Sequence, residues 1–266
     1  MKSLYKLSIL PFLFVFVISC SDDDSSGDEL TGSGMVKIEF DNSVAGDDLI
    51  LGSSYTNSQN ETLTIDRLNY IVGNFRLTDA QGNVFTYPKD QGYFITSEET
   101  GNTEVVLMDV PAGRYTTMTF GIGVDQEKYL LGAEGQGDLL TEAESTNMMW
   151  SWQAGYKFLN FEGSFTSTTV TEATDFKIHM GSHGSSLDNY KETTLSLGTE
   201  ALVSDDMTPI IHLVVNAGNI LDGDNKISLT EQAVIMVSEE KSPKIAVNTS
   251  NMFSVDHVHN GDGSSH

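Results

Sequence analysis

The chain has 266 residues, of which 38 are Asp or Glu and 14 are Lys or Arg, giving a formal net charge of −24 at pH 7. A chain this acidic repels phosphate backbones, so nucleic acid is excluded as an expected partner. Cys20 is its only cysteine, so no disulfide can form within the chain. The length is sufficient for one large domain with a sizeable core.

Residues 1–19 have the composition of a lipoprotein signal peptide and are set apart from the fold. Lys2 and Lys6 give a basic start, and the apolar run Leu7–Ile18 is shorter than the roughly 20 residues that a membrane-spanning helix needs. The sequence Val17-Ile18-Ser19-Cys20 resembles a bacterial lipobox. We therefore predict cleavage before Cys20, lipidation of its thiol and anchoring of the mature protein to a membrane.

Residues 20–34 are predicted to form a flexible acidic tether. The segment is rich in Gly, Ser and Asp and has one apolar residue, Leu30, so it cannot bury enough surface to fold. Ser21-Asp22-Asp23-Asp24 resembles the export signal of Bacteroidetes-type surface lipoproteins. The expected location is the outer membrane, facing either the cell surface or the periplasm.

Residues 35–260 carry many short strand patterns separated by turns, which is typical of a β-sandwich. Alternating apolar residues predict a strand at Met35–Phe40, and Leu63–Leu77 predicts two strands or one strand kinked at Gly73-Asn74. Pro209–Val215 is apolar on both faces, as in a central strand. The predicted fold class is therefore all-β, one β-sandwich domain with long loops.

Three further segments depart from the strand pattern. Residues 124–146 are acidic and glycine-rich, and we expect a long surface excursion with a helical turn. Ser242-Pro243 predicts the start of one short C-terminal helix, with Ser as the cap and Pro at the first helical position. Residues 261–266 are predicted to be a disordered tail.

Met148–Gly163 is the densest aromatic stretch outside the leader and contains both tryptophans, Trp150 and Trp152. The alternation predicts a strand with these two side chains on one face. Two interpretations remain open. The pattern alone favours a place in the core, because aromatic side chains carry large buried area, and the histidines further along raise the possibility of a site.

Histidine pairs occur at two places in the chain. His179 and His183 lie where a predicted strand ends in a glycine-rich turn, and His257 and His259 are separated by one residue. Residues two apart in a strand share a face and lie about 6.5 Å apart, so their imidazoles can share a metal ion. A lone histidine within an apolar strand, such as His212, is expected to be a hydrogen-bonded core residue.

Several motifs occur in order between Met35 and His259, and together they resemble the MbnP-like copper-binding family. They are Leu68–Leu77, Val110–Tyr115, Phe120–Asp125, Met148–Phe158, His179–Ser182, Ile220–Gly223 and Asn251–Phe253. The resemblance implies a β-sandwich outside the cytoplasm that binds copper through histidines. In some members a tryptophan oxidised to kynurenine by a separate di-haem enzyme joins the copper site.

For this chain, the resemblance implies that copper is the bound metal and that the di-haem enzyme is a partner. The membrane, reached through the lipid anchor, is the other expected partner. Imidazole suits copper, which outcompetes other divalent first-row ions at nitrogen sites, and methionine sulfur favours Cu(I). The metal ligands expected from the motifs are His179, His257 and His259, with His183 and Met180 as further candidates and Trp150 or Trp152 as the modified residue.

The leading functional hypothesis is a lipid-anchored extracytoplasmic protein that binds copper for acquisition, delivery or storage and is not an enzyme. The alternative is a surface lipoprotein that binds a glycan or peptide through Trp150, Trp152 and Tyr156, with the histidines structural. A hydrolase is disfavoured because Ser182-His183 lies in no G-x-S-x-G nucleophile elbow. The chain also has no C-x-x-C-H haem motif, so it cannot itself be the oxidising partner.

Overall fold

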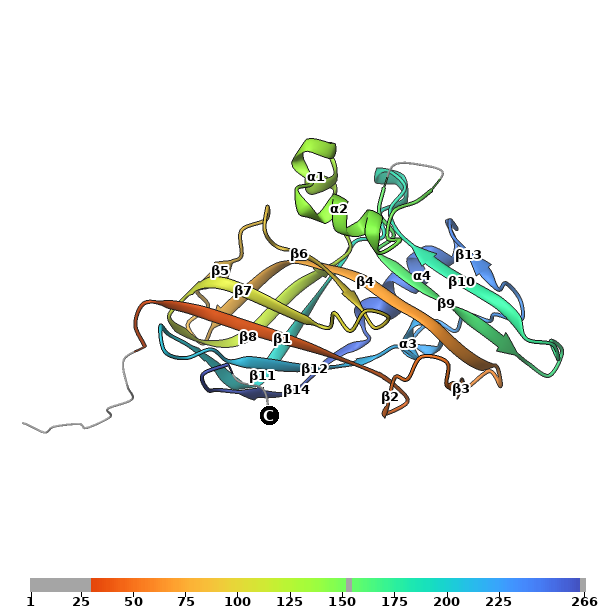
Figure 1. The fold of residues 1–266 in the computed structure, drawn as a ribbon, viewed down its shortest axis with the longest axis horizontal. Coiled ribbons are helices and arrows are strands. Elements are labelled where there is room, and N and C mark those ends of the chain that lie inside the picture. The colour runs from red at the N-terminus through yellow and green to blue at the C-terminus, as the bar shows by residue number, and fades with distance from the viewer. Residues whose placement is uncertain (1–29, 152–154, 264–266) are drawn as a thin grey trace, which may run out of the picture.

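The structure is a computed structural model that describes residues 30–151 and 155–263. Two β-sheets pack face to face, with a helical excursion above one of them (Figure 1). The predicted lipidation site Cys20 and the second tryptophan, Trp152, lie outside the described residues. Within the described ranges, no helix is both long and apolar enough to cross a membrane.

The smaller sheet has five strands and a central parallel pair. Its order is β14 (Phe253–His259), β12 (Ile210–Asn216), β1 (Ser33–Val44) and β2 (Asp47–Asp48), with β7 (Glu104–Pro111) also paired to β1. β1 runs parallel to β12, and the other pairs are antiparallel. Val36, Ile38 and Phe40 are fully buried while Lys37 and Glu39 point outward, so the alternation predicted for β1 is confirmed.

The larger sheet has nine strands organised around β4 (Thr62–Asp79). Its order is β11 (Lys191–Val203), β8 (Gly113–Ile122), β4, β9 (Leu159–Thr166), β10 (Thr174–Met180) and β13 (Val234–Ile235), with β3 (Ser54–Thr56), β5 (Val84–Thr86) and β6 (Tyr93–Ser97) also paired to β4. The register of β4 against β8 shifts between Gly73 and Arg76, where Asn74 has a φ of 53°. Leu63–Leu77 is therefore one strand with an irregularity at the predicted position.

An aromatic cluster joins the two sheets. Phe40 and Phe253 from the smaller sheet meet Tyr70 and Phe120 from the larger one, with ring centroids 5.1–6.2 Å apart and edge-to-face geometry. Such pairs add about 0.5–1.5 kcal/mol each beyond the burial of their surface. The predicted β-sandwich is confirmed, and its core contains this cluster.

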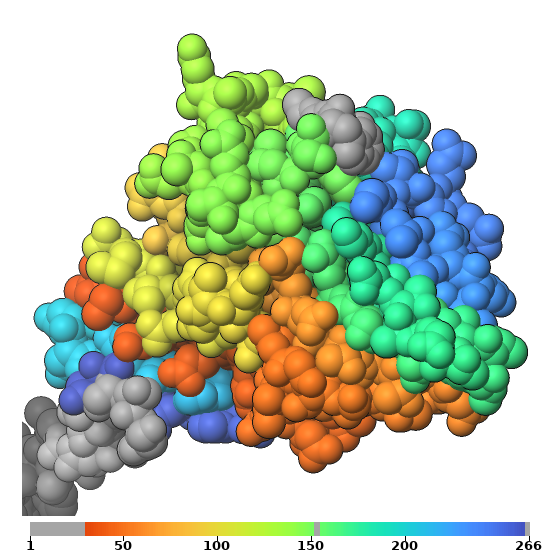
Figure 2. All heavy atoms as spheres, turned by 45° about the vertical axis from the view of Figure 1, so that its right-hand side comes forward, coloured from red at the N-terminus to blue at the C-terminus, as the bar shows by residue number. Residues whose placement is uncertain are grey.

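Helices lie at the edges of the sandwich. They are α1 (Gln126–Tyr129), α2 (Asp138–Ser145), α3 (Asn219–Asp222) and α4 (Lys241–Ser250), with short 3-10 turns η1 (Ala133–Gly135) and η2 (Ser185–Leu187). α4 is the predicted C-terminal helix, but it begins at Lys241 with Glu240 at the N-cap position, so Ser242 and Pro243 lie within its first turn. The excursion before Met148 is more helical than predicted, and it projects above the body of the molecule, where Figure 2 shows it in yellow-green.

Three further sequence predictions are corrected by the structure. Met148–Gly163 is predicted to be a strand, but β9 begins only at Leu159, and the described residues before it form an isolated bridge between Met149 and Tyr156. Residues 33–34, assigned to the tether, belong to β1. Residues 261–262, assigned to the tail, are tied to Thr208 by a backbone hydrogen bond and a bridge.

Candidate functional site

Trp150 lies in a short hairpin, the Trp150 hairpin, whose described residues are 147–151 and 155–158. The amide of Trp150 donates to the carbonyl of Gly155 at 3.1 Å, and that of Lys157 donates to Met148 at 2.7 Å. Gly155 has a φ of 136°, a conformation that glycine adopts at little cost. The two hydrogen bonds show that the chain folds back on itself instead of extending as one strand.

The Trp150 hairpin covers the outer face of the nine-stranded sheet. Asn69 on β4, Asn160 on β9 and His179 on β10 are direct cross-strand partners, so their side chains form one row on that face. The amide of Asn160 donates to the carbonyl of Asn147, and all three row members are buried. A face that would otherwise meet water is therefore enclosed.

His179 is held by a carboxylate beneath the Trp150 hairpin. Its Nε2 lies 2.6 Å from Oε1 of Glu162, whose Oε2 accepts from Arg67 Nη1 at 2.9 Å. Burial lowers the pKa of His179. The hydrogen bond with His179 and the positive charge of Arg67 lower the pKa of Glu162 and outweigh burial, which acts in the opposite direction. At neutral pH the pair is a neutral imidazole donating from Nε2 to a carboxylate, which leaves the lone pair on Nδ1.

Trp150 packs beside two imidazoles. Its ring centroid lies 5.9 Å from that of His179 and 5.3 Å from that of His183. The indole Nε1 donates to the carbonyl of Tyr156 at 3.1 Å, which fixes the ring. Burial also lowers the pKa of His183, so both imidazoles are in the neutral form that binds metals.

Gly181, between the two histidines, permits this packing. A Cβ at that position would lie 2.3 Å from the carbonyl oxygen of Tyr156 and 3.4 Å from the indole of Trp150. Real Cβ atoms essentially never come as close as the first of these distances. The glycine of the His179–Ser182 motif therefore has a packing reason, since only its missing side chain lets the Trp150 hairpin settle on the end of β10.

The remaining predicted ligands lie elsewhere. His257 and His259 are on β14 in the five-stranded sheet, and His257 stacks on His212. Met180 belongs to the hydrophobic core, whereas its neighbour His179 faces the Trp150 hairpin. The structure thus does not bring His179 together with the β14 histidines. In residues 30–151 and 155–263, no group of three or more His, Cys, Asp or Glu side chains could hold a metal ion.

Several residues of this arrangement were missed from the sequence. They are the polar neighbours Arg67, Asn69, Asn160 and Glu162 of the outer face. Asn160 and Glu162 alternate with the buried Leu159 and Phe161, and this period of two was a readable signal for a polar face on β9. No pattern in the sequence indicates that the Trp150 hairpin packs over this face.

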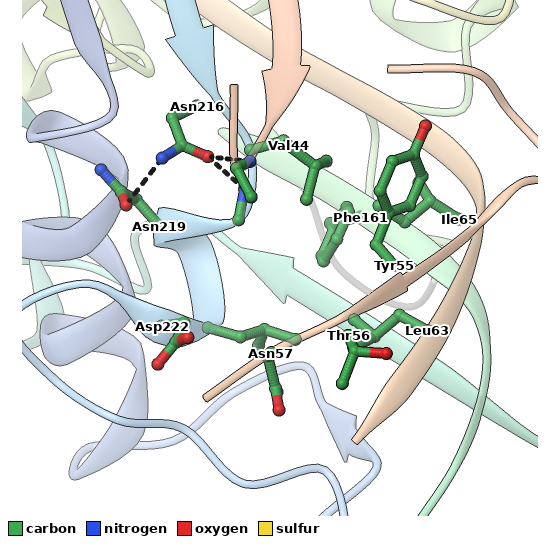
Figure 3. Close-up of a pocket in the computed structure, with 14 residues that line it drawn as sticks. Val44, Tyr55, Thr56, Asn57, Leu63, Ile65, Phe161, Asn216, Asn219 and Asp222 are labelled. Carbon is green, nitrogen blue, oxygen red and sulfur yellow. Dashed lines mark hydrogen bonds between the residues drawn. The ribbon is translucent and has the colours of Figure 1, made fainter. Parts of the chain in front are cut away.

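A separate small cavity of about 110 Å³ lies between β3, β4 and the turn before α3 (Figure 3). Tyr55, Leu63 and Phe161 give it an apolar wall, and Asn216 borders it while accepting from the amide of Gly218 and donating to Asn219 (Figure 3). The described residues that line it include no histidine and no tryptophan. It is therefore distinct from the Trp150 hairpin.

The fold and this arrangement define a β-sandwich protein in which Trp150, His179 and His183 gather on the outer face of one sheet. The MbnP family model matches residues 33–238, and the chain belongs to the MbnP family. Among solved structures it is similar to MbnP from Methylosinus trichosporium, with 14% identity over 78% of this chain and 82% of that chain and a TM-score of 0.49. A comparison with curated proteins gave no match.

Proposed function

We propose that the protein is a lipid-anchored, extracytoplasmic copper-binding protein that takes up copper at the Trp150 hairpin through His179 and His183. The observation that carries this proposal is the packing of one indole beside two neutral imidazoles, one of them oriented by Glu162. The residues that the family model matches include all of these positions and exclude the β14 histidines. Such a protein would serve in the acquisition, delivery or storage of copper.

The donors present fit copper by type. Imidazole nitrogen binds copper well, and a metal-ligating histidine usually donates its other ring N–H to a carboxylate, as His179 does to Glu162. Met180 does not contribute, because its side chain is in the core. An intact indole is a hydrogen-bond donor only, and oxidation of Trp150 to kynurenine by a di-haem partner would add an aryl amine as a further nitrogen donor.

The copper content of protein purified from its native host tests the site. We expect His179→Ala and His183→Ala each to hold one copper ion fewer per chain than the wild type, and the matched variant His259→Ala, which removes a histidine from the other sheet, to hold as much as the wild type. Circular dichroism checks that each variant is folded. Equal copper in all four proteins would mean that the metal binds elsewhere on the chain, and the proposal would be wrong.

Mass spectrometry of the peptide containing Met148 to Lys157 tests the modification. Native-host protein should carry kynurenine at Trp150 or Trp152, and protein made without the oxidising partner should carry intact tryptophan. Two unmodified tryptophans in copper-loaded native protein would confine the site to the histidines.

The membrane anchor is tested separately. Cys20→Ser should move the protein from the membrane fraction to the soluble fraction and abolish labelling by a fatty-acid analogue. Unchanged fractionation and labelling would contradict a lipoprotein.

The alternative of a glycan-binding or peptide-binding aromatic face has less support. Trp150 and Tyr156 are only 5% and 3% exposed, so neither offers a ring face to a large ligand. Trp152, the third residue of that hypothesis, lies outside the described residues.

A further inference from the structure

A second row of charged and imidazole side chains crosses the five-stranded sheet. Glu104 on β7 is the cross-strand partner of Glu39 on β1, Glu39 is the partner of His212 on β12, and His212 is the partner of His257 on β14. Direct partners share a face of a sheet. Because Ile211 and Leu213 are fully buried, the intervening His212 and its row lie on the outer face of the sandwich.

Each imidazole of this row is held by its own carboxylate. Nδ1 of His212 lies 3.0 Å from Oε2 of Glu39, and Nδ1 of His257 lies 2.8 Å from Oδ2 of Asp256. A neutral imidazole that donates from Nδ1 carries its lone pair on Nε2. The two rings are stacked, with centroids 4.2 Å apart and planes inclined by 11°, so the two lone pairs lie on neighbouring rings.

A β-bulge supplies the second carboxylate. His212 pairs with His257 but Leu213 pairs with Val255, so Asp256 is the extra residue of β14. Bulges re-aim side chains. Here two consecutive side chains, Asp256 and His257, are both exposed, at 60% and 57%, and a regular strand would have turned one of them inward. The irregularity places the carboxylate beside the imidazole ring.

The surroundings favour a cation. A hollow of about 520 Å³ beside His212 is lined by five carboxylates, those of Glu39, Asp41, Asp48, Glu98 and Glu104. Burial, then the negative charges of Asp48 and Asp256, raise the pKa of Asp41, and His212 acts in the opposite sense. The two histidines thus sit at the edge of a concentrated negative field, which raises the local concentration of cations.

We propose that His212 and His257 form a second metal site, which binds a divalent transition metal such as Cu²⁺ through their Nε2 atoms. The stacked rings would have to turn out of their parallel arrangement for both Nε2 lone pairs to meet one ion, and water would complete the coordination. Paired carboxylate–histidine units are the arrangement found behind metal-ligating imidazoles. Among divalent first-row ions Cu²⁺ is expected to bind most tightly. This site is on the opposite sheet from the Trp150 hairpin and does not depend on it.

Titration of the full-length protein with Cu²⁺ alone tests the second site. In a His179→Ala/His183→Ala background we expect one Cu²⁺ per chain by isothermal titration calorimetry, with nitrogen hyperfine coupling in the electron paramagnetic resonance spectrum. Adding His257→Gln, an exposed position where folding should be unaffected, should remove that ion and its spectrum. In the otherwise wild-type protein, the same substitution should lower the number of bound Cu²⁺ ions by one, so the test stands even if the background variant folds poorly.

Carboxylate variants separate a built site from general attraction by the acidic face. Glu39→Gln and Asp256→Asn should each weaken Cu²⁺ binding about 10- to 100-fold, the usual cost of removing a group that orients a ligand. Glu104→Gln is the matched control, because it removes one charge from the same row without touching either imidazole, and it should leave the Kd unchanged. Binding that survives His257→Gln, or equal weakening by Glu39→Gln and Glu104→Gln, would overturn the proposal.

Discussion

Glu162 is the residue whose replacement most directly tests the enclosed polar face. Its carboxylate accepts from His179 through one oxygen and from Arg67 through the other, and its side chain is only 20% exposed. Glu162→Gln keeps the size and one acceptor oxygen but removes the charge. The NH2 of the new side chain would also face either His179 or Arg67, and both of these groups donate to Glu162 in the native protein.

The expected loss of stability follows from these two bonds. A hydrogen bond to a charged group contributes about 1.5–3 kcal/mol, and the glutamine retains one neutral bond. We therefore expect the free energy of unfolding to fall by about 2–3 kcal/mol. For a chain of this size that corresponds to a Tm lower by about 4–12 °C, at 2–4 °C per kcal/mol.

Glu99→Gln provides the control. Glu99 accepts from the same Arg67 through Nε and Nη2 at 2.8 and 3.0 Å, but its side chain is 42% exposed. An exposed ion pair contributes about 0.2–1 kcal/mol. Urea titration followed by circular dichroism should rank the two variants clearly. Equal losses would refute the reasoning, since they would mean that the Trp150 hairpin does not enclose Glu162.

Three further predictions concern the framework. Burial alone would raise the pKa of Asp125, but hydrogen bonds, that from Asn74 first, hold this pKa at about 2. The ionised Asp125 therefore stabilises the fold at pH values above the pKa that it has in the unfolded chain, and this stabilisation is lost as the pH falls towards 2. After allowance for partial solvation, urea titrations between about pH 5 and pH 2 should lose about 1–2 kcal/mol that Asp125→Asn does not lose, and parallel pH profiles would contradict this. Gly163→Ala would place a Cβ 2.1 Å from the carbonyl oxygen of Thr64 and should cost at least about 1–3 kcal/mol in the same assay, whereas an unchanged midpoint would mean that β4 and β9 separate easily. Phe253→Ala should lower the free energy of unfolding by about 3–5 kcal/mol because its ring contacts both sheets, and a loss below 1 kcal/mol would place it outside the core.

Elements with a local signal could be predicted from the sequence. The alternation of Val36, Ile38 and Phe40 identifies β1, and Ser242-Pro243 identifies α4 although not its exact first residue, because both signals depend on neighbouring residues only. The prediction of a strand through Trp150 is wrong for a related reason. Period-two alternation is the same in a sheet strand and in the arm of a short hairpin, and the pairing of Trp150 with Gly155 leaves no trace in that alternation.

The candidate sites were predictable only in part. His179 and Trp150 belong to motifs that the family resemblance identifies, and the structure brings these two together. The pairing of His212 with His257 depends on the register of strands more than 40 residues apart and on a bulge at Asp256, neither of which has a local signature. His212 was accordingly expected in the core, whereas its side chain lies on the outer face beside Glu39.

The parallel pairing of β1 with β12 constrains the order in which the chain can fold. β1 is the first strand of the described residues, and its partner β12 begins at Ile210. Lys37 therefore cannot pair with β12 until more than 170 further residues have been synthesised. Contacts so distant in sequence make folding slow, because a long loop must close before the contacts form. β14, which completes that sheet, arrives later still. During synthesis the five-stranded sheet therefore cannot close until almost all of the described chain has been made, whereas β4, β8 and β9 of the other sheet can pair much earlier.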